Sequence, residues 1–395
     1  MNINFGKDTK CCGCAVCSAV CPEKCISIIP DEEGFLYPSI NKDKCIHCGL
    51  CEKKCPVINV YKEKPFSQIG YIVQHKNKDI LINSTSGGFF TAVFEWIIKN
   101  GGYVVGAALD SEFNVKHFIT NKLSDLEKFR NSKYVQSVIS EDIYFKIKEL
   151  LENGTSVCFS GTPCQIEALN HYLDKEYSNI LYVDVVCRAI PSPLVFKKYI
   201  EYQEKRINGK IKEIKFRDKH YGYNFSTMSL KFDNNKNYYH GIESDAFLRC
   251  FFSNICVRPV CYECVFKKRY RCSDITIWDC FDYENIIKDL KKNSGASNVL
   301  IQSSKGKKVF ESIKDNFRYH SIDVEVQVKK AKEMTNCVSI NKQRKEFFNA
   351  CENMNGFELF NKYYPIKIKQ QILFTIRLIL VKVGIYKFIK RILNK

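Results

Sequence analysis

The chain has 395 residues, of which 45% are hydrophobic and 13% aromatic, which is enough for a substantial core and excludes a disordered chain. Residues 1–10 contain no apolar stretch of the kind that a secretory signal needs, so we expect a cytoplasmic protein. In that reducing compartment the 21 cysteines are poor candidates for disulfides, and their short spacings indicate metal binding. The formal net charge of +18 raises the question of a nucleic-acid or anionic-lipid partner.

The first predicted element is a repeated cysteine motif in residues 11–56. Each copy reads C-x2-C-x2-C-x3-C-P, and the second copy begins 34 residues after the first. Three cysteines at this spacing bind one [4Fe–4S] cluster, and the fourth, before proline, binds the other cluster of a two-cluster ferredoxin. A zinc ribbon needs only two C-x2-C pairs and leaves the remaining cysteines of each copy unexplained. The expected ligand sets are Cys11, Cys14, Cys17 with Cys55, and Cys45, Cys48, Cys51 with Cys21.

Two other cysteines of this region, Cys12 and Cys25, are left without a role. Because Cys12 adjoins Cys11, a register shifted by one residue is conceivable. That shift would break the repeat, so we retain Cys11 as the ligand.

After a lysine-containing linker at residues 60–65, hydrophobic periodicity predicts alternating strands and helices. Strands are expected at residues 69–73, 103–109, 156–160, 180–186, 211–216 and 226–232, and helices at residues 88–99, 142–152, 164–173 and 192–206. Residues 247–281 are expected to be mainly coil. The alternation is typical of an α/β domain with a parallel or mixed sheet.

The segment Ser160–Gln165 lies between a predicted strand and a predicted helix. Thr162 fits the helix N-cap, Pro163 the first helical position and Gln165 the capping-box partner. Free backbone N–H groups and the helix dipole would then favour a phosphate beside Gly161 and Thr162. The dipole also favours the thiolate of Cys164, as a nucleophile or a metal ligand. A capped helix with an incidental cysteine explains the segment equally well.

Two further segments carry weaker signals. In Ser84–Gly88 the glycines allow close approach of a ligand and the hydroxyls can bond to it, although a plain helix N-cap is the simpler interpretation. Asp184–Arg188 ends an apolar strand, where the loops of open α/β sheets usually bind ligands. A lone Cys187 would more often be a core residue.

Cysteines are dense again towards the end of the α/β region. They are Cys250, Cys256, Cys261, Cys264, Cys272 and Cys280. Cys261 and Cys264 form one C-x2-C pair, which is half of a metal site and needs partners from elsewhere in the fold. Cys164 and Cys187, both expected near strand ends, are the obvious partners. We expect these four cysteines to bind a third [4Fe–4S] cluster; structural zinc and free thiols are the alternatives.

The composition changes beyond residue 345, and residues 365–395 form a basic tail without an acidic residue. Its eight cations supply 8 of the 18 net positive charges. The tail is also rich in apolar residues, but Arg377 and Lys382 interrupt them. No uninterrupted apolar run in the tail is therefore long enough to span a membrane. Over residues 385–395 the cations and the apolar residues separate onto two faces of a helix, which predicts a basic amphipathic helix on an anionic membrane surface. A helix packed on the protein itself is the alternative, and nucleic acid is not an expected partner.

In this order, the motifs resemble those of the coenzyme F-420 hydrogenase/dehydrogenase beta-subunit family. The resemblance extends to about residue 310. It rests on the ferredoxin repeat and on Ser84–Gly88, Lys133–Ser137, Ser160–Gln165, Asp184–Cys187, Pro191–Pro193, Phe216–Lys219, Cys261–Cys264 and Ser273–Ile277. It implies a flavoprotein that binds FAD and passes electrons between [4Fe–4S] clusters and a small-molecule, two-electron substrate. It also implies FAD phosphate at Gly161 and Thr162, and a flavin lined by Ser86, Gly87, Gly88, Lys133, Tyr134 and Val135.

The resemblance carries expectations about partners as well. Because the chain has no hydrogenase or formate dehydrogenase motif, a ferredoxin or another redox protein would supply the electrons. Bacterial members of the family occur among exopolysaccharide biosynthesis proteins. Arg188 stands where relatives usually have histidine, and Trp278–Asp282 where they have Gly-Asp-Phe-Trp-Gly, so neither the substrate nor the use of a deazaflavin is predicted. A non-catalytic electron-transfer subunit is the alternative function.

The expected fold class is therefore α+β or α/β. A two-cluster ferredoxin module would occupy residues 1–62, and a mixed-sheet domain that binds flavin and a cluster would occupy residues 66–155 and 156–325. A helical extension at residues 326–364 and the amphipathic tail at residues 365–395 would follow. The expected location is the cytoplasm, with peripheral attachment to the inner face of the cell membrane.

Overall fold

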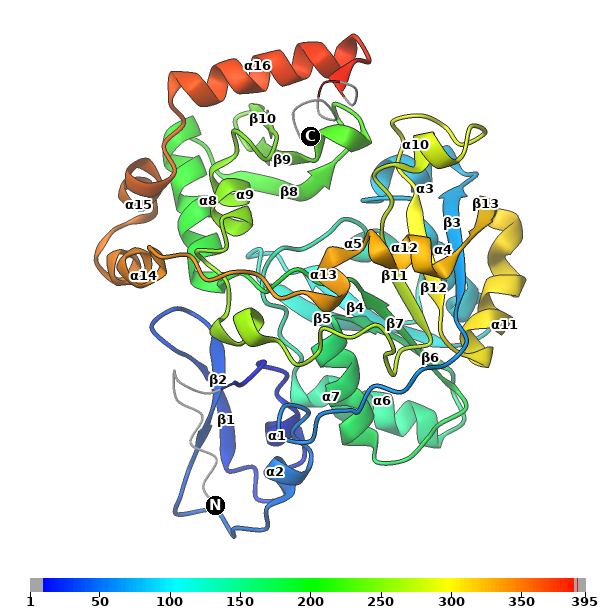
Figure 1. Cartoon of the computed structure of the whole chain (residues 1–395). Helices are drawn as coiled ribbons and strands as arrows, with labels where there is room; N and C mark the ends of the chain where they lie inside the picture. Colours follow the sequence, from blue (N-terminus) through cyan, green and yellow to red (C-terminus); the bar gives the residue numbers. More distant parts are fainter. Residues whose placement is uncertain (1–9, 387–388, 390–395) are drawn as a thin grey trace.

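The computed structural model describes residues 10–386 and residue 389 (Figure 1). These residues form a two-stranded, a three-stranded and an eight-stranded sheet. The strands are β1 (Ile26–Pro30), β2 (Leu36–Ile40), β3 (Ile69–His75), β4 (Tyr103–Leu109), β5 (Val115–Thr120), β6 (Val157–Gly161), β7 (Ile180–Val185), β8 (Ile211–Asp218), β9 (Thr227–Phe232), β10 (Asn237–His240), β11 (Ile275–Asp279), β12 (Ser297–Ile301) and β13 (Phe317–Ile322).

The cysteine repeat is also a repeat of backbone structure. Two short helices, α1 (Val16–Ala19) and α2 (Leu50–Lys53), occupy equivalent positions in the two copies. Their N-cap residues, Ala15 and Gly49, both have left-handed backbone angles, with φ of 63° and 72°. A left-handed alanine is uncommon, so the same sharp turn is imposed on both copies. The antiparallel pair β1–β2 closes the module.

The eight-stranded sheet has the order β13-β3-β12-β11-β7-β6-β4-β5. The four strands β11, β7, β6 and β4 are parallel to their neighbours within this group, and the outer strands pair antiparallel. The predicted α+β or α/β class with a mixed sheet is therefore confirmed. Parallel strands bring their carboxyl ends to one edge, and β6 and β7 there lead into Thr162 and Val186.

Helices cover both faces of this sheet. Val183 of β7 packs on one face with α4 (Phe89–Lys99) and α11 (Ser304–Ile313), whereas its neighbour Tyr182 packs on the other face with α6 (Glu141–Glu152) and α7 (Pro163–Leu173). This alternation follows from the two-residue period of a strand. Three short helices complete this part: α3 (Lys78–Asn83), α5 (Leu126–Phe129) and α10 (Tyr283–Ile286).

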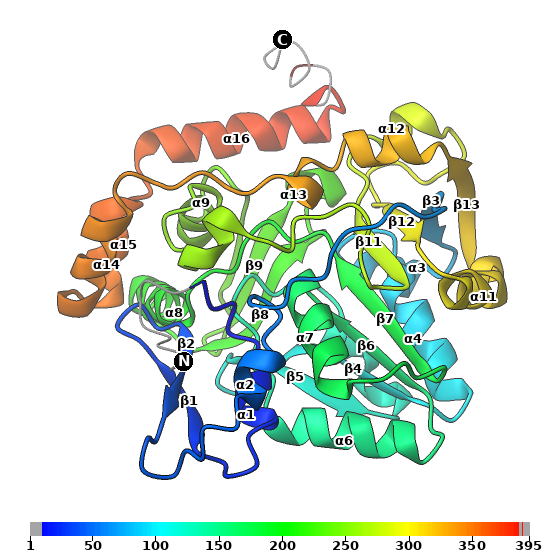
Figure 2. The same cartoon turned by 60° about the horizontal axis from the view of Figure 1, so that its bottom comes forward.

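The ferredoxin module lies against α6 and α7, which Figure 2 shows beside α1 and α2. The Tyr144 hydroxyl of α6 donates to the Cys14 carbonyl over 2.7 Å. Lys54 forms an ion pair of 2.5 Å with Asp174, which follows α7. The first contact holds the first cysteine copy against the α/β domain, and the second contact holds the second copy.

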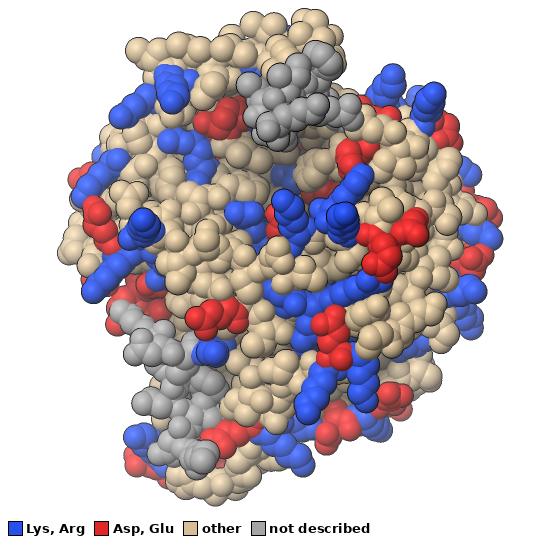
Figure 3. All heavy atoms as spheres, viewed as in Figure 1, with Lys and Arg blue, Asp and Glu red and all other residues tan. Residues whose placement is uncertain are grey.

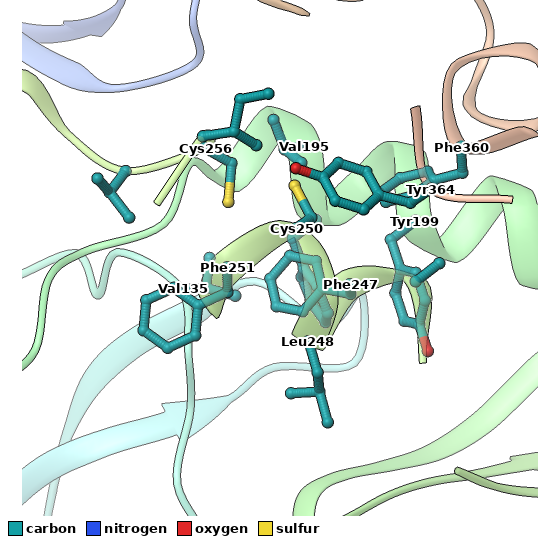
Figure 4. Close-up of a cluster of buried hydrophobic side chains, with 14 of the residues drawn as sticks. Val135, Val195, Tyr199, Phe247, Leu248, Cys250, Phe251, Cys256, Phe360 and Tyr364 are labelled. Atoms are coloured by element: carbon teal, nitrogen blue, oxygen red, sulfur yellow. The ribbon is translucent and has the colours of Figure 1, made fainter. Parts of the chain in front are cut away.

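A second core packs the small β10-β9-β8 sheet against α8 (Pro193–Ile207) and α9 (Ala246–Phe252). It is rich in aromatic residues, and Figure 4 shows Cys250 and Cys256 buried in it beside Phe247 and Tyr364. The helices that follow the large sheet are α12 (Val324–Lys329), α13 (Lys332–Thr335), α14 (Arg344–Asn353), α15 (Gly356–Tyr363) and α16 (Ile368–Lys382).

All ten strands and helices predicted between residues 69 and 232 are present, with ends shifted by at most two residues. Residues 247–281, predicted as mainly coil, instead contain α9 and β11. The short apolar run Ile275–Asp279 becomes a strand because β7 and β12 pair with it on either side. The amphipathic helix predicted for residues 385–395 lies outside the described residues, apart from residues 385, 386 and 389. Among the helices described, none has the length and apolar character needed to cross a membrane.

Candidate functional site

The first predicted ligand set lines one cavity. Cys11, Cys14, Cys17 and Cys55 surround it together with the apolar side chains of Ile28, Leu36, Pro38 and Val57. Burial raises the pKa of the Cys17 and Cys55 thiols, so in the free state they stay protonated at neutral pH. Binding of iron as thiolates would therefore release protons.

The second predicted set lies nearer the surface. Cys21, Cys45 and Cys51 pack around Cys25, whereas Cys48 is exposed. The sulfur atoms of Cys21 and Cys25 are 3.4 Å apart. One set of cysteines thus lines a cavity in the interior of the ferredoxin module, and the other set lies nearer the surface of the module.

The four body cysteines that we predicted as partners line a third cavity. Cys164 comes from the first turn of α7, and Cys187 follows β7 by two residues. Cys261 and Cys264 lie in and directly after the short 3-10 helix Pro259–Glu263. Burial raises the pKa of Cys187 to about 12 and of Cys264 to about 11. The fold therefore assembles these thiols from three distant segments.

Local interactions hold this cavity in shape. The predicted capping box at α7 is confirmed, since the Thr162 N–H donates to the Gln165 side chain over 2.9 Å. The Thr162 hydroxyl lies 3.1 Å from the Cys164 sulfur. Behind the cavity, Arg271 forms a buried ion pair of 2.8 Å with Asp184.

The same capping box bears on the phosphate site predicted at the start of α7. Free N–H groups were predicted beside Gly161 and Thr162 as a seat for FAD phosphate. The Thr162 N–H is instead engaged by Gln165, and the Thr162 side chain faces Cys164 in the third cavity. Thr162 therefore belongs to the surroundings of the cysteine cavity, and a phosphate at Gly161 and Thr162 stays a prediction.

Cys12 is a residue of the candidate site to which the sequence reasoning gave no role. It lines both the first ferredoxin cavity and the third cavity. A side-chain hydrogen bond with Cys12, together with burial, raises the pKa of the Cys164 thiol. No spacing rule could reveal this position, because Cys164 is distant in sequence and the fold alone brings the two thiols together.

The donor sets fit [4Fe–4S] clusters. Such a cluster takes four cysteine thiolates around a cube of iron and sulfide, and both the first and the third cavity are lined by at least four cysteines. Within residues 10–386 no group of three or more His, Cys, Asp or Glu side chains is arranged to hold a single metal ion.

The two segments predicted to line a flavin lie side by side. The Ser132 N–H donates to the Thr85 hydroxyl over 2.9 Å, which joins the loop before α4 to the loop before Val135. Ser86 and Gly87 are both bonded to the Ser297 hydroxyl, at 2.7 and 2.9 Å. Gly88 has a φ of 83° and serves as the N-cap of α4. Val135 is buried in the aromatic core.

Cationic side chains gather around these segments. Arg217 donates to the Tyr134 hydroxyl over 3.0 Å and to Asp279 over 3.1 Å, while its Nη2 atom is buried without a partner. Lys219 donates to the carbonyls of Leu81, Ser86 and Ser294. Lys133 donates to the carbonyls of Lys128 and Arg130. Burial lowers the pKa of both Lys133 and Lys219 to about 7.

Comparison with known proteins identifies two regions. Residues 10–59 match the 4Fe-4S dicluster domain, which confirms the predicted ferredoxin region. Residues 154–327 match the C terminus of the coenzyme F420 hydrogenase/dehydrogenase beta subunit.

Curated relatives match the ferredoxin region. "Ferredoxin 7Fe" of Hydrogenibacillus schlegelii is 42% identical over 67 residues, which are 16% of this chain and 77% of that protein. An uncharacterized polyferredoxin-like protein of Methanocaldococcus jannaschii is 39% identical over 61 residues, or 13% of this chain. The matched region spans only 36% of that relative's length.

Among solved structures, a chain of the F420-reducing [NiFe] hydrogenase complex from Methanosarcina barkeri is similar, with a TM-score of 0.45 and 16% identity. The similarity covers 73% of this chain and 95% of that chain. The matched regions and the cysteine sites define an iron–sulfur electron-transfer protein. More specifically, the chain combines a dicluster ferredoxin domain with the C-terminal domain of the coenzyme F420 hydrogenase/dehydrogenase beta subunit.

Proposed function

We propose that this protein is an FAD-dependent iron–sulfur oxidoreductase that passes electrons between a redox protein and a small-molecule substrate. The observation that carries the proposal is the shared lining of two cavities by Cys12. Clusters in these cavities, together with one at the exposed Cys48, would form a continuous line of three centres. Such a line leads electrons from the surface into the α/β domain.

In this proposal the electron donor, a ferredoxin or another redox protein, docks at the second ferredoxin cluster. Cys48 is exposed there, and the neighbouring Ile46 and Ile58 expose more than half of their surface. An exposed cluster edge beside apolar side chains is what a transient redox partner needs for close approach. The first cluster then passes the electron to the third cluster, bound by Cys164, Cys187, Cys261 and Cys264.

FAD, when bound, supplies the conversion between single-electron transfers and a two-electron step. We assign its site to Ser86–Gly88 and Lys133–Tyr134. The buried Nη2 atom of Arg217 supports this assignment, because an anionic group of the cofactor would satisfy a donor that has no partner in the protein. Lys219 would hold the Ser86 loop in place through the Ser86 carbonyl.

Anaerobic purification with assay of iron and flavin tests this function. Three clusters and one flavin predict about 12 iron atoms and one FAD for each chain. Bound FAD that is reduced through the clusters would support the proposed oxidoreductase function. A chain with full iron content and no FAD would instead be a non-catalytic electron-transfer subunit.

The resemblance to bacterial exopolysaccharide-associated members favours a substrate from polysaccharide biosynthesis. Deletion of the gene should then make an oxidised precursor accumulate and lower the polysaccharide yield. Unchanged polysaccharide composition would exclude this role while leaving the redox function untouched.

We further propose that α16 attaches this otherwise cytoplasmic protein to an anionic membrane surface. The exposed apolar residues of α16 and its C-cap are Ile368, Ile372, Leu373, Ile376, Ile379 and Val383. Arg377 is held by Glu243 and by the carbonyls of Asn224 and Phe225, so the helix is anchored to the protein. Its outer surface, along the top of Figure 3, is largely uncharged, and Lys and Arg side chains lie near its left end. Apolar residues with flanking cations are typical of helices that lie in an anionic interface.

Sedimentation with phosphatidylserine-containing vesicles tests the membrane proposal. Ile376→Glu should reduce binding about tenfold or more, since burying one such side chain is worth about 1.5–3 kcal/mol. Val326→Glu is the matched control, because Val326 on α12 is 47% exposed and Ile376 is 48% exposed. Equal binding of both variants and the natural chain would exclude α16 as the membrane contact.

A further inference from the structure

Arg258 carries a fully buried guanidinium at the junction between the ferredoxin module and the α/β domain. Its side chain has 0% exposure and lines the third cavity. Nε donates to the Cys11 carbonyl over 2.8 Å, and Nη2 donates to the Leu36 carbonyl over 2.9 Å. Nη1 donates to the Gln136 side-chain oxygen over 3.1 Å. Every hydrogen-bond partner of this cation is therefore neutral.

Three other buried cations among residues 10–386 each have a carboxylate partner. Arg271 pairs with Asp184 at 2.8 Å, Lys268 with Glu167 at 2.7 Å and Arg217 with Asp279 at 3.1 Å. Arg258 has no carboxylate within ion-pair distance among residues 10–386. It lies over the Tyr37 ring, 4.1 Å from the centroid, but an aromatic face offsets only part of a buried charge. A buried charge without a counterion is costly, so a missing anion is expected beside Arg258.

The chain around Arg258 points to the source of that anion. Arg258 accepts a hydrogen bond of 3.0 Å from the Cys261 N–H and donates to the Cys11 carbonyl, so it touches one proposed ligand of each neighbouring cluster. In the first cysteine loop, Gly13 leaves room for it: a Cβ atom there would lie 2.9 Å from Nη1. His47 occupies the equivalent position of the second copy. The arginine therefore serves the first copy and not the second.

We infer that Arg258 is the counterion shared by the first and third clusters, and that it raises the reduction potential of both. A cluster held by four thiolates carries net negative charge, and reduction adds another negative charge. A fixed cation in a low-dielectric junction stabilises the reduced state more than the oxidised state. Arg258 is thus a positioning residue for the electron path, because it favours electrons at the two inner clusters over the outer cluster. The inference rests on the proposed third cluster.

A potentiometric titration of the full-length protein, followed by electron paramagnetic resonance, tests this inference. Arg258→Met should shift the midpoint potentials of the first and third clusters to more negative values. The second cluster, with Cys21, Cys45, Cys48 and Cys51, should keep its potential and serves as an internal reference. Arg258→Lys keeps the positive charge, so both midpoint potentials should stay close to those of the natural protein.

Two further variants separate charge from structure. Gln136→Glu places a carboxylate on Arg258 without removing the arginine, and it should lower the same two potentials even if Arg258→Met assembles poorly. Arg344→Met is the matched control, because Arg344 also joins the ferredoxin module to the body, through Glu33, but lines neither cavity.

Unchanged potentials in Gln136→Glu and Arg258→Met, or an equal shift of all three clusters, would overturn the role of Arg258. So would the same shift in Arg344→Met. A natural chain with about eight iron atoms would refute the third cluster, and the shift of the first cluster relative to the second would still decide the role of Arg258.

Discussion

The ferredoxin module and the third cavity are both built from cysteine side chains, but the chain brings these cysteines together in opposite ways. The module collects eight predicted ligands within residues 11–55, where spacing and two sharp turns place them. The third cavity collects Cys164, Cys187, Cys261 and Cys264 from segments that only the large sheet brings together. A locally encoded site should survive damage to the domain beside it. A site assembled by tertiary structure should be lost with the packing that supports it.

The largest expected effect comes from breaking the buried ion pair behind the third cavity. Asp184→Ala leaves Arg271 charged, buried and without its partner, which should lower the free energy of unfolding by about 3–5 kcal/mol. The third cluster should be lost, and the ferredoxin clusters should remain. Denaturation followed by tryptophan fluorescence reports the α/β domain, because Trp96 and Trp278 both lie in it. A decrease in the free energy of unfolding below about 1 kcal/mol would show that the Arg271–Asp184 ion pair does not stabilise the domain.

An intermediate effect is expected at the junction of the two regions. The Ser192 hydroxyl caps α8 by accepting the Val195 N–H, and it also donates to the Glu33 carbonyl of the ferredoxin module. Ser192→Ala should cost about 1–2 kcal/mol, because both bonds are lost at a buried position. Chemical denaturation measures this loss. Ser192→Thr keeps the hydroxyl and should recover part of it; identical curves for all three proteins would contradict the assignment.

The smallest effect is expected at the surface. Glu325 is paired with Arg269 at 2.6 Å, but its side chain is 72% exposed. Glu325→Gln should change the free energy of unfolding far less than Asp184→Ala does, and less still at high salt. If the same denaturation experiment gave a loss comparable to that of Asp184→Ala, burial would not be what distinguishes the two pairs.

The same contrast explains what the sequence could predict. The ferredoxin repeat and the capping box at Thr162 are local, so their spacing was sufficient. The strand β11 and the position of Cys12 depend on distant neighbours: β11 needs β7 and β12, and Cys12 needs Cys164. The Thr162 N–H is engaged because the capping partner Gln165, correctly predicted, itself accepts from it. Arg258 carried no sequence signal, since its significance lies in having no carboxylate within ion-pair distance among residues 10–386.

The central claim is that three clusters form one line, with the third held by cysteines of the body. Iron content of Cys261→Ala, measured beside that of Cys158→Ala, tests it most directly. Cys158 is also fully buried, but it lies in the core beneath α4 and lines neither cavity. The account predicts about 12 iron atoms per chain for the natural protein and for Cys158→Ala, and about eight for Cys261→Ala, with the ferredoxin signals retained. Equal iron content in Cys261→Ala and the natural protein would contradict it.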